Sequence, residues 1–216
     1  MTRAAGAVAT GSWDNSHAMD LFAPHDILTP IQLADGELAL LPQLALPLPT
    51  SELMACLVEQ TAWRAETVVV YGKRHLQPRL TAWHGDAAYT YSGLTLAPVP
   101  FSPLLQTIRS AVESATGHRY NSVLLNYYRD GRDSMGMHSD DEPELGPAPA
   151  IASLSLGATR TFILRHKQTG QTVKLDLPDG SLLLMAGSLQ RHWLHGINKT
   201  ARPVGPRLNL TFRYIV

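Results

Sequence analysis

His138-Ser139-Asp140 is the stretch around which this chain is organised, and it is followed by His195 and by Arg207-Leu-Asn-Leu-Thr-Phe-Arg213. Side chains two positions apart on an extended strand point to the same face, so His138 and Asp140 can both reach one metal ion. With a second imidazole they form a ligand set that leaves coordination positions open and suits non-haem Fe(II). Because a His-x-Asp is common in a chain with nine histidines, this hypothesis depends on its context.

The second imidazole can come from His195 or from His192. The residues between Asp140 and His195 read as several strands, which could return a histidine beside His138 across a barrel. Positions three apart on a strand face opposite ways, so only one of the two histidines can join the site.

The arginine motif that follows suggests a binding site for a carboxylate. Arg207 and Arg213 are six positions apart, so on a strand they share a face. A guanidinium binds a carboxylate through two parallel hydrogen bonds, and a dicarboxylate has two ends to hold. The alternative is that both arginines are charges on the outward face of an edge strand.

Composition limits the possibilities without identifying the chemistry. A chain of 216 residues with 44% hydrophobic content can form one globular domain with a sizeable core. Its formal net charge is zero, so any nucleic acid must be bound by local patches. The single cysteine, Cys56, excludes an internal disulfide and a cysteine-based zinc site. Neither a long apolar run nor a signal peptide is evident, so we expect a cytoplasmic protein with no membrane contact.

Four segments carry a family resemblance: His138-Ser-Asp-Asp-Glu142, Ile151-Ala-Ser-Leu-Ser-Leu-Gly157, His195 and the arginine motif 207–213. They resemble the AlkB family of Fe(II)/2-oxoglutarate-dependent nucleic-acid dealkylases, from about Val68 to Arg213. The resemblance implies that Fe(II) is held by His138, Asp140 and His195, which serve as the catalytic and metal-binding residues, with O2 as co-reactant. It also implies that Arg207 holds the distal carboxylate of 2-oxoglutarate and Arg213 the proximal one. Assisting contacts are implied for Asn126, Tyr128, Asn209 and Thr211.

The pattern of elements predicts a mainly β protein with two helices. Thr50 or Ser51 can cap one helix, and a second is bounded by a Ser102 cap and a Gly117 terminator. Strands are expected at 37–41, 67–70, 121–128, 151–156, 161–166, 172–177, 181–185, 192–197 and 208–215. Their spacing predicts a sandwich or barrel. With the resemblance, this becomes an α+β, mainly β, double-stranded β-helix (jelly roll) with flanking helices.

The same reasoning divides the chain. Residues 1–18 lack periodicity and are expected to be a disordered leader. Residues 19–216 are expected to form a single dioxygenase domain, with a nucleotide-recognition lid at about 67–95 and the jelly-roll core at about 120–216.

Candidate substrate residues lie mostly in the lid. Tyr71-Gly72-Lys73 could form a turn whose aromatic tip enters a base stack, although an ordinary hairpin tip is an equal alternative. Tyr89 and Tyr91 alternate to one face, where they could line a base pocket or simply pack on the core. The resemblance makes Tyr91 a stacking ring and Tyr89 a polar contact. Lys73, Arg74 and Arg79 are candidates for phosphate contacts, and Asp141 could accept a hydrogen bond from the exocyclic amine of a flipped base.

The function implied by the resemblance is repair of 1-methyladenine and 3-methylcytosine in DNA by direct reversal, releasing formaldehyde, succinate and CO2. The expected partner is alkylated DNA, with RNA also considered, and the protein is expected to be a monomer. One alternative is a related hydroxylase acting on RNA, protein or a small molecule, which would have no use for Tyr71 and Tyr91. Another is a non-catalytic or zinc-holding jelly roll, which would not need Arg207 and Arg213.

Overall fold

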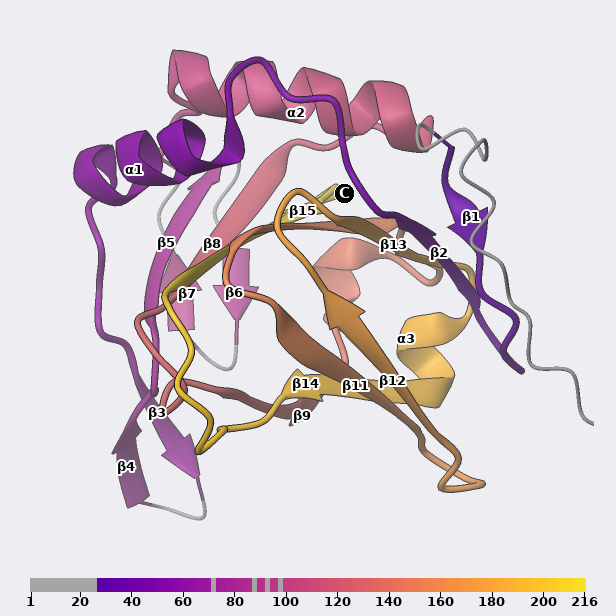
Figure 1. Ribbon diagram of the computed structural model, residues 1–216. Coiled ribbons are helices and arrows are strands. Elements are labelled where there is room, and N and C mark those ends of the chain that lie inside the picture. The colour runs from indigo at the N-terminus through magenta and orange to yellow at the C-terminus, as the bar shows by residue number, and fades with distance from the viewer. Residues whose placement is uncertain (1–26, 71–72, 87–88, 92–93, 97–98) are drawn as a thin grey trace, which may run out of the picture.

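The computed structural model describes residues 27–70, 73–86, 89–91, 94–96 and 99–216 (Figure 1). The leader predicted for residues 1–18 lies outside the described residues, so that prediction stays untested. None of the helices within these ranges is long and apolar enough to cross a membrane.

Two antiparallel sheets form the core of the molecule (Figure 1). The larger contains, in order across it, β1 (Thr29–Pro30), β2 (Glu37–Leu41), β13 (Leu182–Ala186), β10 (Ile151–Gly157), β15 (Arg207–Arg213), β8 (Ser122–Tyr128) and β5 (Leu80–Gly85). The smaller contains β12 (Thr172–Leu177), β11 (Arg160–His166), β14 (Trp193–Ile197) and β9 (Met135–His138). Neighbouring strands are mostly distant in sequence, which is typical of a jelly roll. The predicted fold class is confirmed.

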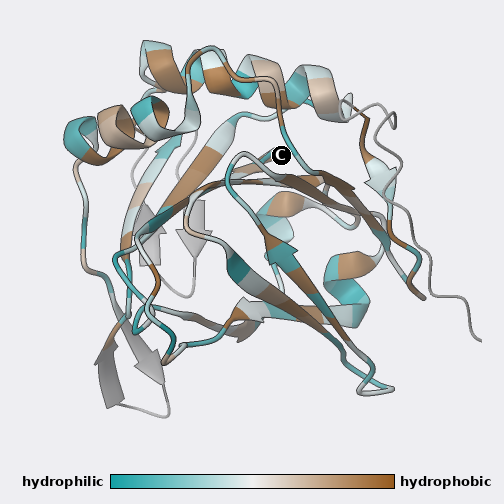
Figure 2. Ribbon diagram, viewed as in Figure 1, coloured by the Kyte–Doolittle hydropathy of each residue, from teal (hydrophilic) through white to brown (hydrophobic). Residues whose placement is uncertain are grey.

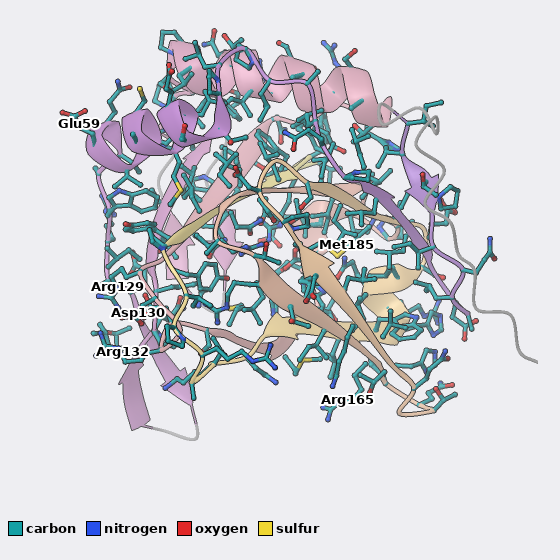
Figure 3. All side chains as sticks on the ribbon, in the orientation of Figure 1. Glu59, Arg129, Asp130, Arg132, Arg165 and Met185 are labelled. Carbon is teal, nitrogen blue, oxygen red and sulfur yellow. The ribbon has the colours of Figure 1, made fainter. Side chains whose placement is uncertain are left out.

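The space between the sheets is filled by apolar side chains from both. Ile151 and Met185 of the larger sheet pack in one cluster with Phe162, Leu164 and Trp193 of the smaller sheet and its connections. Figure 3 shows Met185 in this interior and charged side chains such as Arg165 at the periphery. The colouring of Figure 2 follows the same division, because the apolar positions concentrate on the strands. Burial of this layer fixes the two sheets relative to each other.

Two helices cover the outer face of the larger sheet (Figure 1). Helix α2 (Pro103–Thr116) begins after Ser102, whose hydroxyl accepts from the backbone N–H of Leu105, and ends at Gly117 with φ 72°. Both predicted boundaries are confirmed. Helix α1 (Thr50–Gln60) corrects the other prediction, because Pro49 is its N-cap and no side chain caps it. The Thr50 hydroxyl instead donates to Asp179 Oδ2 at 2.5 Å.

The remaining elements are short. Strands β3 (Thr67–Val70) and β4 (Lys73–Leu76) pair with each other, as do β6 (Tyr89–Tyr91) and β7 (Leu94–Leu96). These two small sheets are separate from the main ones, and they occupy the region predicted as a lid. The 3-10 turn η1 (Pro143–Leu145) and the short helix α3 (Leu189–His192) complete the fold.

Candidate active site

The three predicted metal ligands lie close together where β14 pairs with β9. They are His138, Asp140 and His195. Strand β14 pairs with β9 so that His195 lies directly opposite His138. Ligand atoms of the three side chains all lie within 4.8 Å of one another. The expected strand through Asp140 is wrong, because β9 ends at His138 and Asp140 lies in the connection that follows. Asp140 therefore reaches His138 and His195 from the segment that follows β9.

Local hydrogen bonds orient the His138 ring toward Asp140. Nδ1 of His138 lies 2.9 Å from the carbonyl oxygen of Gly136, and Nε2 lies 3.4 Å from Asp140 Oδ1. Because a carbonyl can only accept, Nδ1 carries a proton in this contact, and Nε2 is the ring nitrogen that faces the carboxylate. The ring of His195 stacks on Phe162, with the ring centroids 5.3 Å apart. Both imidazoles are thus held in place before any ligand arrives.

Burial and charge keep Asp140 and His195 in the protonation states that a metal needs. Burial would raise the pKa of Asp140, but the charge of Arg213 together with the nearby histidines holds it well below its usual range. Burial, reinforced by the charge of His138, lowers the pKa of His195 to about 3. Nδ1 of His195 is buried and has no hydrogen-bond partner within the described ranges. A carboxylate, a neutral His195 imidazole and the imidazole of His138 at this spacing fit a divalent cation.

Arg207 is a buried cation whose hydrogen bonds are incomplete. It is 1% exposed, and its Nη2 donates to Ser155 Oγ at 2.9 Å. Nε and Nη1 are buried without a hydrogen-bond partner among the residues described. No ion pair in the described part of the chain involves Arg207. Burial lowers its pKa to about 10. A buried guanidinium in this state fits an incoming carboxylate, which would satisfy both its charge and its free N–H groups.

Arg213 has a protein partner already. Its Nη2 and Nε donate to Asp140 Oδ2 at 2.7 and 3.2 Å. The arginine predicted to hold the proximal carboxylate of 2-oxoglutarate is therefore also the counter-charge of a candidate metal ligand. Neither arginine is an outward-facing edge charge, since both are buried on β15, which lies between β10 and β8.

One cavity brings the predicted metal and cosubstrate residues together. Its lining includes Asn126, Tyr128, His138, Asp140, His195, Arg207, Asn209, Thr211 and Arg213. Strands β8 and β15 are adjacent, with Asn126 opposite Asn209 and Tyr128 opposite Arg207. Residues about 80 positions apart in the sequence therefore face the same cavity. The roles assigned to these residues stay predictions.

Several residues of the site were missed from the sequence. Ser153 Oγ accepts from Asn209 Nδ2 at 2.8 Å, and Ser155 accepts from Arg207. Their signal was present, because two serines alternate with apolar residues along Ile151–Gly157 and so share one face of the strand. Gln190 accepts from the backbone N–H of Asp140, and nothing in the local sequence marks it.

The predicted substrate residues have mixed outcomes. Tyr71 and Gly72 lie outside the described residues, and the side chains of Lys73, Tyr89 and Tyr91 are likewise not described. Asp141 directly follows Asp140 in the chain, and its side chain is 62% exposed, so its predicted role in substrate binding stays a prediction. Its Oδ2 lies 3.5 Å from Lys167 Nζ.

Arg79 requires a correction. It was expected to contact phosphate, but it is 2% exposed and its Nε donates to Asn126 Oδ1 at 2.8 Å. A side chain buried against β8 cannot reach the backbone of a duplex. Its contact with Asn126 fixes that amide, so that the NH2 group of Asn126 is the end left to face other partners.

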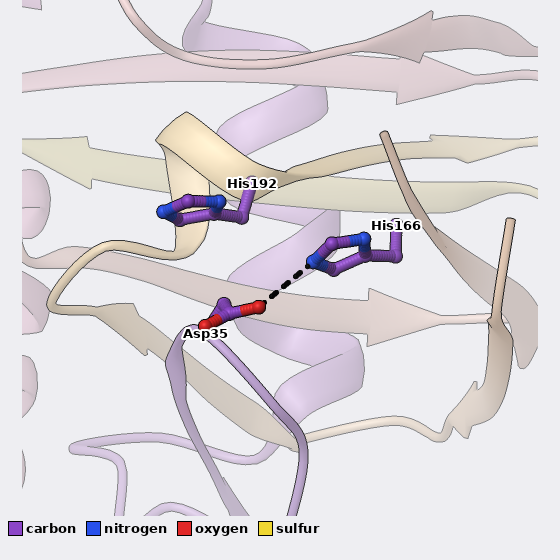
Figure 4. A group of neighbouring side chains, drawn as sticks. All are labelled: Asp35, His166 and His192. Carbon is purple, nitrogen blue, oxygen red and sulfur yellow. Dashed lines mark hydrogen bonds and ion pairs between the residues drawn. The ribbon is translucent and has the colours of Figure 1, made fainter. Parts of the chain in front are cut away.

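A second group of possible ligands, Asp35, His166 and His192, lies elsewhere (Figure 4). His192 ends α3 instead of beginning the predicted strand at 192–197, which explains why it does not join the triad. Nδ1 of His166 accepts from the backbone N–H groups of Gln168 and Thr169. Its proton must therefore be on Nε2, 3.2 Å from Asp35 Oδ2. With its lone pair occupied, the buried His166 ties the Asp35 turn to β11 and is unsuited to bind a metal.

Comparisons with known proteins agree with this geometry. The family model described as the 2OG-Fe(II) oxygenase superfamily matches residues 37–213. The chain is 44% identical over 169 residues to the human protein named alpha-ketoglutarate-dependent dioxygenase alkB homolog 3, covering 74% of this chain and 59% of that protein. It is 47% identical over 159 residues to the mouse protein named DNA oxidative demethylase ALKBH2, covering 69% and 66%. The chain thus spans about three fifths of the length of the alkB homolog 3 relatives.

A solved structure supports the fold independently. The structure of OsALKBH1 aligns with a TM-score of 0.60 at 19% sequence identity, covering 85% of this chain and 100% of that chain. At this level of identity the likeness concerns the fold alone.

Proposed function

This chain belongs to the AlkB family within the 2OG-Fe(II) oxygenase superfamily, and on that premise we propose that it removes alkyl groups from damaged DNA bases by oxidation. The proposed substrates are 1-methyladenine and 3-methylcytosine, and the products are the repaired base, formaldehyde, succinate and CO2. The printed name of the ALKBH2 relatives, DNA oxidative demethylase, supports the reaction class.

The observation that carries the proposal is that one cavity contains both a candidate cation site and a buried arginine suited to a carboxylate. The triad offers a carboxylate and two imidazoles, and Arg207 offers a buried positive charge with two nitrogens, Nε and Nη1, that have no hydrogen-bond partner among the described residues. An apolar binding module needs neither. A cosubstrate that bridges a metal and an arginine uses both, and 2-oxoglutarate has a chelating end and a distal carboxylate.

In this proposal each polar group of the cavity has a separate task. His138, Asp140 and His195 hold Fe(II), and Arg207 holds the distal carboxylate of 2-oxoglutarate through its free N–H groups. Arg213 keeps Asp140 ionised and would hold the proximal carboxylate of 2-oxoglutarate. When bound, Fe(II) and 2-oxoglutarate supply the oxidising chemistry, by which O2 hydroxylates an N-methyl carbon. Further contacts to 2-oxoglutarate are proposed for four other residues of the cavity, Asn126, Tyr128, Asn209 and Thr211.

The base must be brought to this cavity from a base-paired strand. A base inside a duplex is out of reach, so extrusion costs a few kcal/mol and costs least for a damaged pair. Asp141, exposed beside the metal ligand Asp140, is proposed to accept a hydrogen bond from the exocyclic amine of the flipped base. Tyr71 is proposed to enter the duplex at the position that the extruded base has left. Tyr89 and Tyr91 are proposed to cover the extruded base.

The test is release of formaldehyde and succinate with Fe(II) and 2-oxoglutarate on oligonucleotides carrying one 1-methyladenine. Matched single-stranded DNA, double-stranded DNA and RNA should be compared. Turnover that disappears in a His138→Ala variant supports dealkylation, and the ratio between strands reports on Tyr71. Succinate formation without dealkylation of any of these would reject the nucleic-acid substrate and favour a hydroxylase of another class. An active His138→Ala variant would remove the metal assignment itself.

We further propose that the protein works as a monomer in the cytoplasm. The single cysteine, which forms no disulfide in the structure, supports a reducing compartment. Sedimentation of the metal-loaded protein with and without an oligonucleotide tests the monomeric state.

A further inference from the structure

We propose that Gln190 is a positioning residue for the metal centre: its buried amide fixes the backbone of Asp140 and sets that ligand relative to His195. The inference rests on the proposed metal site. It concerns a side chain that does not touch the metal, the cosubstrate or the base.

The contact between Gln190 and Asp140 is direct and enclosed. Gln190 is 2% exposed, and its Oε1 accepts from the backbone N–H of Asp140 at 3.0 Å. Because β9 ends at His138, the N–H of Asp140 has no place in a strand ladder. The Gln190 side chain supplies the acceptor that the sheet does not.

The Gln190 side-chain amide makes one other contact among the described residues, and that contact is weak. Its Nε2 lies 3.9 Å from Met185 Sδ, and a thioether is a weak acceptor. Burying an amide is costly unless it is hydrogen-bonded. Among the described residues, the strong hydrogen bond of the Gln190 side chain is thus the one that it accepts from the backbone of Asp140, a candidate metal ligand.

The neighbours of Asp140 are anchored to the same short segment. Ser139 Oγ donates to the carbonyl oxygen of Trp193 at 3.2 Å. Lys167 Nζ donates to the carbonyl oxygen of Gln190 at 3.0 Å and lies 3.5 Å from Asp141 Oδ2. Three consecutive residues, 139–141, are therefore held by the segment 190–193 or through a lysine bound to it.

That segment leads straight into the second histidine ligand. Helix α3 ends at His192, and β14 begins at Trp193 and carries His195. Gln190 therefore links the loop that bears Asp140 to the element that bears His195. Two ligands far apart in sequence become parts of one rigid unit before the metal binds, so the cost of ordering them is not taken from the binding free energy.

The consequence is measurable as metal affinity in the absence of turnover. Loss of a residue that orients a ligand typically weakens metal binding by about 10- to 100-fold. Gln190→Met keeps the length of the side chain but removes the acceptor, and we expect it to weaken Mn(II) binding by at least about tenfold. Gln190→Glu keeps an oxygen at the same place, and we expect it to stay within about threefold of the unmodified protein.

The experiment measures the dissociation constant of Mn(II) by electron paramagnetic resonance of the free ion, on the full chain and without 2-oxoglutarate. Val112→Ala serves as the matched control, because Val112 is buried in α2 on the far face of the larger sheet and its truncation destabilises without approaching the site. We expect the control to lower the melting temperature and leave Mn(II) binding unchanged.

Two results would overturn the inference: a Gln190→Met variant that binds Mn(II) like the unmodified protein, or a Gln190→Glu variant as weak as Gln190→Met. Failure of the proposed metal site looks different, since the unmodified protein would then bind no Mn(II), or His195→Ala would bind it equally well. Failure of the proposed dealkylation alone would leave Mn(II) binding and its dependence on Gln190 intact.

Discussion

The guanidinium of Arg213 donates to the carboxylate of Asp140 at 2.7 Å, and both side chains are almost completely buried. The pair joins the last residue of β15 to the loop after β9, so it crosses from the larger sheet to the end of the smaller one. Asp140 consequently remains ionised inside the protein whether or not a cation is present.

Removing Arg213 should leave an uncompensated buried charge. We expect Arg213→Gln to lower the free energy of unfolding of the metal-free protein by about 3 kcal/mol, the usual cost of breaking a buried pair. Mn(II) should restore part of the loss, because it supplies the missing positive charge. Urea denaturation with a chelator and then with Mn(II) measures both. An Asp140→Asn/Arg213→Gln double variant should lose less than the sum of the single losses, and simple additivity would contradict the pairing.

Removing Arg207 should have the opposite effect on stability. Since its buried charge lacks a carboxylate, Arg207→Met is expected to raise the free energy of unfolding of the ligand-free protein by about 1–2 kcal/mol. The same change should abolish the rise in melting temperature that 2-oxoglutarate produces with Mn(II), because a ligand stabilises only the state it binds. Differential scanning calorimetry tests both. A destabilised variant that still responds to 2-oxoglutarate would show that Arg207 is structural.

The low pKa of His195 predicts a pH dependence of stability in the metal-free protein. A histidine in the unfolded chain titrates near 6.5, whereas burial lowers the pKa of His195 to about 3. Between these values the unfolded state binds a proton that the folded state excludes. The free energy of unfolding should therefore fall by about 1.4 kcal/mol per pH unit as the pH drops from about 6.5 toward 4.

This contribution can be separated from that of Asp140. The folded pKa of Asp140 lies below 3.8, so its stabilisation is complete above that pH and is lost only below it. Denaturation curves between pH 4 and 6.5 in chelator, on His195→Gln and on the exposed-site control His118→Gln, isolate the effect. The slope should be shallower by this amount in the first variant and unchanged in the second; equal slopes would rule out His195 as the source.

Gly196 should control the approach of the two histidine-bearing strands. A Cβ at this position would meet the carbonyl oxygens of Met135 and Gly136 at 2.8 and 3.0 Å. The ladder between β14 and β9 is irregular between His195 and Ile197. Gly196→Ala should push β14 from β9 and weaken Mn(II) binding at least about tenfold, by displacing a ligand. Titration with Mn(II) checks this, and Gly205→Ala, whose added Cβ would meet only Ala158 Cβ at 4.0 Å and whose φ is not positive, is the control for glycine substitution.

Much of the architecture could be inferred from the sequence because it depends on neighbours in the chain. Helix α2 begins after Ser102 and ends at Gly117, since capping and left-handed backbone are local properties. The recurrence of short strands predicted a sandwich or barrel for a similar reason, and the family resemblance narrowed this prediction to a jelly roll. The prediction that Arg207 and Arg213 share a face is also confirmed, because β15 is one uninterrupted strand with a side-chain period of two.

The tertiary structure alone decided how the charged groups pair. Asp140 lies outside the strand and accepts a hydrogen bond from Arg213. Arg79 is buried and donates to Asn126. The ring of His192 stacks on that of His166 and does not join the triad. Gln190, with no local signal, became the acceptor for Asp140. These choices depend on which strands are adjacent and in which register, and on the cost of burying a charge without a partner. Sequence spacing determines the face on which a side chain lies, whereas its partner is set by non-local pairing of strands and by the low polarity of the interior.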